Sequence, residues 1–157
     1  MTAAHFYATL QSPLGEIVLT SSGSAITGLY TPEHAFYAKA KKGICNPKSF
    51  QQAIKQLNEY FDGKRSKFDL ALAANGTEFQ KRVWKVLRGI RCGETKSYGA
   101  IAKSLKNPKA SRAVGLANSK NPICIIVPCH RVIGADGRLT GYAGGIKAKK
   151  WLLNHEK

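Results

Sequence analysis

The pattern of apolar residues changes partway along the chain, and this change constrains the fold more than any other feature. The first half opens with short, mostly apolar runs at residues 5–10, 16–20 and 25–30. Turn-forming stretches separate these runs, namely Ser12-Pro13-Leu14-Gly15 and Ser22-Gly23-Ser24. Short runs alternating with such turns predict β-strands.

A helix is predicted after a lysine-rich connection that contains Gly43 and Pro47. Its apolar residues repeat at helical spacing until Asp62-Gly63 ends it, and they are Phe50, Ile54, Leu57 and Phe61. No motif of catalytic chemistry occurs in this half, so we expect it to serve in packing. The chain should divide near Ala73-Ala74-Asn75-Gly76, giving an N-terminal α/β structural domain of residues 1–75 and a C-terminal domain of residues 76–157.

The second half begins with a longer helix. Thr77 is a suitable N-cap, and Gln80 three residues later completes a capping box. The buried side of this helix is expected to carry apolar residues spaced by three or four, with Trp84 in the core beside them: Phe79, Val83, Val86, Leu87 and Ile90. Cys92-Gly93 should end the helix.

Two short helices follow, and they suggest a helix-turn-helix. Ser97 caps the first, which runs through Leu105, and Asn107-Pro108 should begin the second, because proline is favoured at the first helical position. The second helix is rich in small residues that would let its backbone approach a groove closely: Ala110, Ser111, Ala113 and Gly115. Arg112 is the one long side chain among them. Close packing between helices is the alternative explanation, since many helix pairs bind no nucleic acid.

Two more elements complete the expected α+β fold. Residues 123–127 form a continuous apolar run, as a buried strand would, and lead into Pro128-Cys129-His130-Arg131-Val132. After Gly144-Gly145, a terminal helix is predicted from residue 146 to about residue 155. Its apolar residues are Ile146, Trp151, Leu152 and Leu153.

The net charge of +16 is distributed unevenly. Residues 1–75 hold 8 Lys and Arg against 5 Asp and Glu, whereas residues 76–157 hold 17 against 4. This asymmetry favours a polyanionic partner for the second half, with a merely basic surface as the alternative. Charge of this kind supplies affinity for nucleic acid without choice of sequence.

The cysteines predict free thiols and no metal site. Cys45, Cys92, Cys124 and Cys129 include no CxxC pair and no matching set of Cys and His ligands. We expect the first three to pack as small hydrophobic residues. No apolar run is long enough to span a bilayer, and Met1-Thr2-Ala3-Ala4-His5-Phe6 does not resemble a secretory signal, so a cytoplasmic protein is expected.

Cys129 followed by His130 suggests an activated thiol, because a basic neighbour lowers the pKa of a thiol and the thiolate is the nucleophile. In an extended segment, adjacent side chains point to opposite faces, so direct contact would need a bent backbone or a bridging water. A cysteine hydrolase would fit the pair as well. Glu156, taken alone, is expected to be a solvated charge near the end of the terminal helix.

The string around this pair is more specific. Residues 76–156 resemble the catalytic domain of the O6-alkylguanine-DNA alkyltransferases, in order and with natural spacing. The matching segments are Gly76-Thr77, Phe79-Gln80, Val83-Trp84, Ser97-Tyr98, Ile101-Ala102, Arg112-Ala113-Val114-Gly115, Ala117-Asn118, Asn121-Pro122, Pro128-Cys129-His130-Arg131-Val132-Ile133 and Gly141-Tyr142-Ala143-Gly144-Gly145. The first half agrees in length and coarse pattern with the family's smaller, ribonuclease-H-like α/β domain.

This resemblance implies roles for residues of the reactive centre. Cys129 matches the alkyl acceptor, His130 the base that acts through a water, and Glu156 the carboxylate that orients the histidine. Tyr98 matches the donor to the departing guanine. Asn121 matches a residue that links the DNA-binding helices to the active-site segment by hydrogen bonds.

The resemblance also implies a guanine pocket and a DNA surface. The pocket would use the Val132 carbonyl and a loop from residue 139 to 144, including Leu139, Tyr142, Ala143 and Gly144. Ala143 often is Ser in the family, but its backbone N–H makes the contact with O6. Cys124 stands where some relatives have Pro in the pocket wall. Arg112 matches a finger that fills the space left by a flipped base in minor-groove binding, and the other implied DNA contacts are Tyr98, Gly99, Asn107, Ser111 and Ala113.

The implied function is direct reversal of DNA damage. A monomer without cofactor or metal would flip O6-alkylguanine, and more weakly O4-alkylthymine, out of double-stranded DNA and transfer the alkyl group irreversibly to Cys129 in one turnover. The alternative is a lesion-binding protein without transfer. Relatives of that kind carry another residue, typically Trp, where this chain has Cys129.

Overall fold

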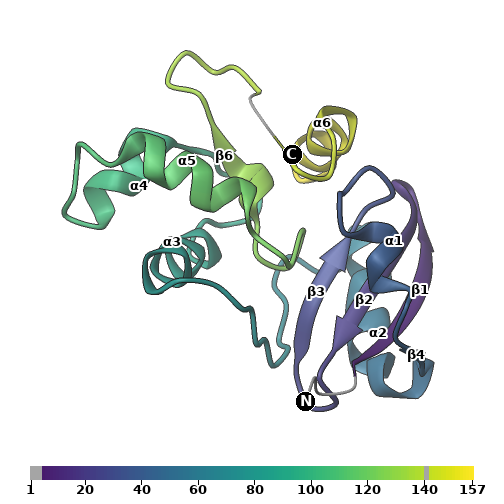
Figure 1. Ribbon diagram of the computed structural model, residues 1–157. Coiled ribbons are helices and arrows are strands. Elements are labelled where there is room, and N and C mark those ends of the chain that lie inside the picture. The colour runs from purple at the N-terminus through teal and green to yellow at the C-terminus, as the bar shows by residue number, and fades with distance from the viewer. Residues whose placement is uncertain (1–4, 140–141) are drawn as a thin grey trace.

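The computed structural model describes residues 5–139 and 142–157, and these residues form the expected α+β fold. Figure 1 shows a lobe built on a β-sheet and a lobe of helices, with α6 at their junction. The first lobe contains β1 (Phe6–Ser12), β2 (Gly15–Ser21), β3 (Ile26–Tyr30), α1 (Tyr37–Ala40), β4 (Ile44–Cys45) and α2 (Gln51–Phe61). The remainder contains α3 (Glu78–Arg88), β5 (Lys96–Ser97), α4 (Tyr98–Ser104), α5 (Ser111–Ser119), β6 (Val132–Ile133) and α6 (Ile146–His155).

The sheet of the first lobe has the strand order β3-β2-β1-β4. Strands β1 to β3 pair antiparallel at the positions that the sequence predicts, and the predicted helix is α2. Burial of apolar side chains from the strands and α2 forms the core of this lobe: Ala8, Ile17, Leu19, Leu29, Phe50, Ala53, Leu57 and Tyr60. The sequence analysis missed α1 and the two-residue strand β4, which pairs parallel with β1.

Helix α3 confirms the predicted start but not the predicted end. The Thr77 side chain accepts from the Gln80 N–H, and the Gln80 side chain accepts from the Thr77 N–H, so the capping box is present. The helix ends at Arg88 rather than at Cys92-Gly93. Its last turn tightens through a bond of 3.0 Å from the Gly89 N–H to the Val86 carbonyl, and the chain leaves the helical path there.

The two short helices are present, but the second begins later than predicted. Ser97 caps α4 as predicted, and the helix ends at Ser104, one residue before the predicted end at Leu105. Helix α5 begins at Ser111 and not at Asn107-Pro108. The Ala110 N–H donates to the Asn107 carbonyl at 3.0 Å, so proline occupies a turn between the helices instead of the first helical position.

The run at residues 123–127 is buried as predicted, but it is not a strand. Only Ile123 forms a bridge, with Leu29 at the end of β3. The Val127 N–H then turns back to the Ile123 carbonyl at 3.0 Å, and Ile125 has a left-handed φ of 71°. The apolar run is therefore a buried turn.

Helix α6 has the predicted bounds. Of the apolar residues named for it, Leu152 is buried and Ile146 is 45% exposed, and the charged Lys149 is its other buried residue. Among residues 5–139 and 142–157, no helix is long and apolar enough to cross a bilayer.

Two short pairings bring distant segments together. Strand β5 pairs parallel with β6, with Ser97 opposite Ile133. This pairing places the start of α4 beside the segment that follows Cys129. The bridge between Leu29 and Ile123 joins the first lobe to the turn that precedes Cys129.

Candidate active site

Cys129 and His130 lie in a short, bent segment rather than an extended one. Residues Cys129–Arg131 form a 3-10 turn, in which the Arg131 N–H donates to the Pro128 carbonyl at 3.0 Å. Both side chains are enclosed, with Cys129 3% exposed and His130 completely buried. A bent backbone is one of the two ways, with a bridging water, in which adjacent Cys and His side chains were expected to be able to interact.

The surroundings of Cys129 favour its thiolate. A hydrogen bond with the Cys124 thiol lowers the pKa of Cys129, as do a hydrogen bond with Asn121 and the nearby charge of Lys149, against the opposing effect of burial. Cys124 itself is buried, as predicted, whereas Cys45 is exposed and Cys92 is half-buried. The prediction of a packed cysteine is therefore wrong for Cys45.

Asn121 holds the turn that precedes the cysteine. Its side-chain N–H donates to the Val127 carbonyl at 2.8 Å, and its side-chain oxygen accepts from the Ile123 N–H at 3.0 Å. The Asn118 side chain in α5 also donates to the Cys129 carbonyl at 3.3 Å. These bonds connect the end of α5 to the reactive segment. The family resemblance implies this link for Asn121, whereas Asn118 is an additional contact that the sequence did not predict.

His130 is held by a carboxylate on one side of its ring. Its Nε2 lies 2.8 Å from Glu156 Oε2, and because a carboxylate only accepts, Nε2 carries the proton. Within the described residues, the buried Nδ1 has no hydrogen-bond partner. Burial lowers the pKa of His130 although Glu156 opposes this effect, so the imidazole is neutral at pH 7 with a lone pair at Nδ1.

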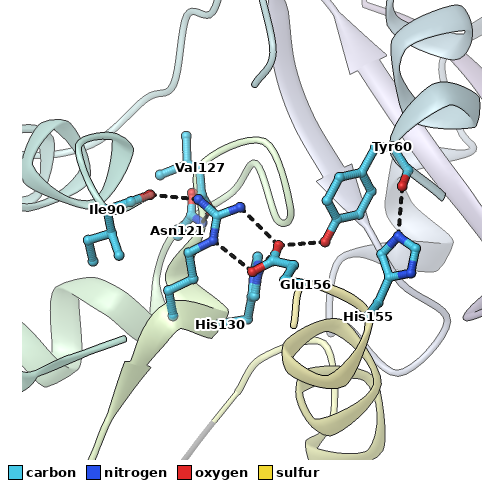
Figure 2. Close-up of polar contacts among 8 residues, drawn as sticks. Tyr60, Ile90, Asn121, Val127, His130, His155 and Glu156 are labelled. Atoms are coloured by element: carbon cyan, nitrogen blue, oxygen red, sulfur yellow. Dashed lines mark hydrogen bonds and ion pairs between the residues drawn. The ribbon is translucent and has the colours of Figure 1, made fainter. Parts of the chain in front are cut away.

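Glu156 is the centre of a buried polar network (Figure 2). Arg131 donates to both carboxylate oxygens at 2.9 Å, and the Tyr60 hydroxyl of α2 donates to Oε2 at 2.6 Å. Burial would raise the pKa of Glu156, but hydrogen bonds from His130 and Arg131 outweigh it and keep the pKa below its usual range. The side chain is 1% exposed, so the expectation of a solvated charge from the residue alone is wrong.

Arg131, Lys149 and Tyr60 are the site residues that sequence reasoning missed. Arg131 also donates to the Ile90 carbonyl at 2.6 Å, and Lys149 Nζ donates to the Val132 carbonyl at 2.6 Å. The signal for Lys149 was its helical spacing with Leu152 and Glu156, which places all three on one face of α6. The Val132 carbonyl keeps a second lone pair for a further donor.

The proposed DNA contacts lie on and beside α4 and α5. Arg112 and Ala113 are exposed, Ser111 and Gly99 are partly exposed, and Asn107 is exposed in the turn between the helices. The Tyr98 ring lies beside Gly115 of α5. From residue 95 to residue 135 the chain has no Asp or Glu, so no acidic side chain of this stretch opposes its lysines and arginines.

The expected pocket loop is described in part. Leu139 is partly buried, Tyr142 is 8% exposed, and Ala143 and Gly144 form a turn directly before α6. Gly141, which belongs to the matching motif, lies outside the described residues. In the described part of the chain, no three His, Cys, Asp or Glu side chains are grouped closely enough to hold a metal ion.

A cysteine nucleophile of lowered pKa beside a basic pair of short helices defines a class of protein that combines thiol chemistry with nucleic-acid binding. Comparison with family models specifies this class. Residues 5–74 match the ribonuclease-like domain, and residues 78–157 match the DNA-binding domain, of 6-O-methylguanine DNA methyltransferase. The chain belongs to this family.

Similar proteins cover almost the whole chain. The methylated-DNA–protein-cysteine methyltransferase of Mycobacterium tuberculosis is 51% identical over 96% of this chain and 92% of its own length. That of Methanosarcina acetivorans is 50% identical over 96% and 97%, respectively. The solved structure of Mycobacterium tuberculosis OGT in complex with DNA superposes with a TM-score of 0.91, at 51% identity, covering 97% of this chain and 92% of that one.

Replacing Glu156 tests whether the buried carboxylate holds the two lobes together. Glu156→Gln leaves the buried Arg131 without a counter-charge, so we expect a loss of about 3–5 kcal/mol in the free energy of unfolding. Tyr60→Phe removes only one hydrogen bond to a charged group and should cost about 1.5–3 kcal/mol. Urea denaturation at pH 7 measures both, and equal losses would contradict the central role of the carboxylate.

The same variant has a predicted pH signature. Because the folded-state pKa of Glu156 is depressed, its stabilisation is complete above the ordinary carboxyl value of 4.5 and is lost as the pH falls toward the folded-state pKa. Glu156→Gln should therefore lose less stability than the unchanged protein between pH 5 and about pH 3. Identical acid dependence of the two proteins would refute this assignment.

Cys124 is predicted to tune the reactivity of Cys129. Cys124→Ala removes a hydrogen bond that lowers the pKa of Cys129, so this pKa should rise. The thiolate fraction at pH 7 should then fall, by about tenfold for an increase of one in the pKa. The rate of iodoacetamide addition to Cys129, followed by mass spectrometry against pH, measures the shift. Cys124→Ser keeps a donor and serves as the control. An unchanged profile in Cys124→Ala would show that the contact has no influence.

Proposed function

We propose that this protein repairs DNA by transferring an alkyl group from O6 of guanine in duplex DNA to its own Cys129. The observation that carries the proposal is a buried thiol of lowered pKa next to a histidine that burial keeps neutral and a carboxylate orients. Membership of the 6-O-methylguanine DNA methyltransferase family supports the substrate. O4-alkylthymine would be a weaker substrate.

The proposed step is a displacement at the alkyl carbon. The Cys129 sulfur forms a bond to this carbon while the bond to O6 breaks, and the electron pair remains on guanine. The thiol proton passes to His130 Nδ1 through a water, since Nε2 already donates to Glu156. A thioether has no leaving group that water can displace, so the protein would act once and need no cofactor.

The leaving group would be stabilised by donors positioned around the base. Tyr98, at the first position of α4, would donate to N3 of guanine, and the Ala143 N–H would donate to O6. The Val132 carbonyl would accept from the guanine amino group, beside the bond that it receives from Lys149. We further propose that the lesion-binding surface and this chemistry belong to a unit of residues 76–157, with residues 1–75 as a separate structural domain.

Reaching a buried thiol requires the base to leave the DNA stack, which costs a few kcal/mol. Arg112 is exposed on α5 among small side chains, as a finger that fills the vacated space would need to be. Exposed cations near both helices would contact phosphates: Lys103, Lys106, Lys109 and Lys120. Such binding needs one protein molecule per lesion, and we propose that the protein acts as a monomer.

Intact-mass measurement after incubation with a duplex that contains one O6-methylguanine tests the function directly. One equivalent of duplex should add about 14 Da, located at Cys129 by fragmentation. Cys129→Ser should abolish transfer while retaining DNA affinity within a few-fold, and Cys45→Ser, which removes an exposed thiol, should react normally. DNA binding without any mass change would favour the lesion-binding alternative, and many turnovers would favour a hydrolase.

Arg112→Ala tests base flipping. The variant should react with methylated duplex more slowly by roughly ten- to a hundredfold, because the extruded base is no longer replaced in the stack. Its reaction with free O6-benzylguanine should stay within twofold of the unchanged protein. Lys120→Ala removes an exposed cation just beyond the same helix and is the matched control. Equal losses on both substrates would exclude a flipping role for Arg112.

A further inference from the structure

One buried hydrogen bond joins the first lobe to the turn before α6. Thr31 directly follows β3 and is 1% exposed. Its Oγ1 donates to the Gly144 carbonyl at 2.9 Å, across 113 residues of sequence. No catalytic motif occurs near Thr31 in the sequence, and the family resemblance gives it no role.

The turn that receives this bond has little of its own to fix it. The Gly145 N–H donates to the Tyr142 carbonyl at 2.9 Å, which closes a four-residue turn. Two of its four residues are glycines, which rotate about their backbone bonds at low energetic cost. The internal hydrogen bond therefore leaves the central peptide groups of the turn free to tilt unless another contact holds them.

Residues of the first lobe approach both glycines too closely for any side chain. A Cβ atom at Gly144 would lie 2.8 Å from Thr31 Oγ1 and 2.7 Å from the Tyr142 ring. A side chain at Gly145, where φ is +99°, would collide with the Glu33 carboxylate. The loop at residues 31–33 thus packs directly against the turn, and the Thr31 hydroxyl is the group that bonds to it.

The position of the Ala143 N–H depends on this contact. The Gly144 carbonyl and the Gly145 N–H belong to one planar peptide group, and this N–H donates to the Tyr142 carbonyl, which shares a peptide plane with the Ala143 N–H. Fixing the Gly144 carbonyl therefore also restricts the tilt of the Ala143 N–H. The Ala143 N–H is the proposed donor to O6 of guanine, and a donor to a leaving group is effective only if it is held in place before the reaction.

We propose that Thr31 is a positioning residue that fixes the guanine-contacting turn at residues 142–145 from the opposite lobe. The proposal rests on the proposed function, because it concerns how the departing guanine is held. The first lobe would thus take part in the reaction through the guanine pocket and not through the thiol. Thr31 orients the pocket, whereas other residues set the pKa of Cys129.

The test compares three reactions of each variant. Thr31→Val removes the hydroxyl with little change in volume, and Thr31→Ser retains it. Thr20→Val is the matched control, since Thr20 is a buried threonine of β2 whose Oγ1 makes one side-chain hydrogen bond, with Thr27 at 2.9 Å. The reactions are transfer from O6-methylguanine duplex, transfer from free O6-benzylguanine, and addition of iodoacetamide at Cys129, which needs no guanine pocket.

Thr31→Val is expected to slow both guanine reactions by roughly three- to tenfold, the range of one lost neutral hydrogen bond, and to leave iodoacetamide addition unchanged. Thr31→Ser should restore both rates within twofold, and Thr20→Val should alter none of the three. Thr31→Ala should reproduce the pattern if the valine variant does not fold.

Three results would overturn the proposal. Unchanged guanine reactions in Thr31→Val would show that the bond does not position the turn. A parallel loss of iodoacetamide reactivity would show a general structural defect. Absence of transfer by the unchanged protein would overturn the proposed function and the role of Thr31 with it. Normal transfer by the unchanged protein, with equal guanine reaction rates in Thr31→Val, would overturn only the role of Thr31.

Discussion

A carboxylate enclosed by protein is stable only when hydrogen-bond donors replace the water that it has lost. Glu156, the C-cap of α6, meets this condition with three donors from two other segments: Tyr60 of α2, and His130 and Arg131 beside Cys129. The carboxylate in turn fixes each donor. One buried charge thus orients His130 and joins the end of α6 to both α2 and the segment that follows Cys129.

Different groups set the pKa of the Cys129 thiol and the pKa of His130. Cys129 has a lowered pKa through hydrogen bonds with Cys124 and Asn121 and through the charge of Lys149, none of which involves the imidazole. Burial meanwhile keeps His130 neutral. A protonated histidine would stabilise the thiolate but could not receive its proton. In this site the neutral imidazole keeps an accepting lone pair at Nδ1, and Cys124, Asn121 and Lys149 stabilise the thiolate instead.

The sequence predicted those features that depend on neighbouring residues, such as the capping box at Thr77 and the start of α4 at Ser97. It failed where packing between distant segments decides the conformation. An apolar run at residues 123–127 indicates burial, but a buried turn and a buried strand share that signal. The bond from the Val127 N–H to the Ile123 carbonyl and the left-handed Ile125 distinguish them. Lys149 is a charged residue on the buried side of α6, so a pattern of apolar residues could not indicate its burial.

The contacts that complete the site join residues far apart in the chain, 96 positions between Tyr60 and Glu156 and 113 between Thr31 and Gly144. The entropy of closing a loop grows with its length, so such contacts form after local helices and turns. A chain that has folded α3, α4 and α5 but has not yet docked its first lobe would therefore lack the ordered base and the fixed pocket. On the proposed function, docking of the first lobe would therefore be the step that completes the site for transfer.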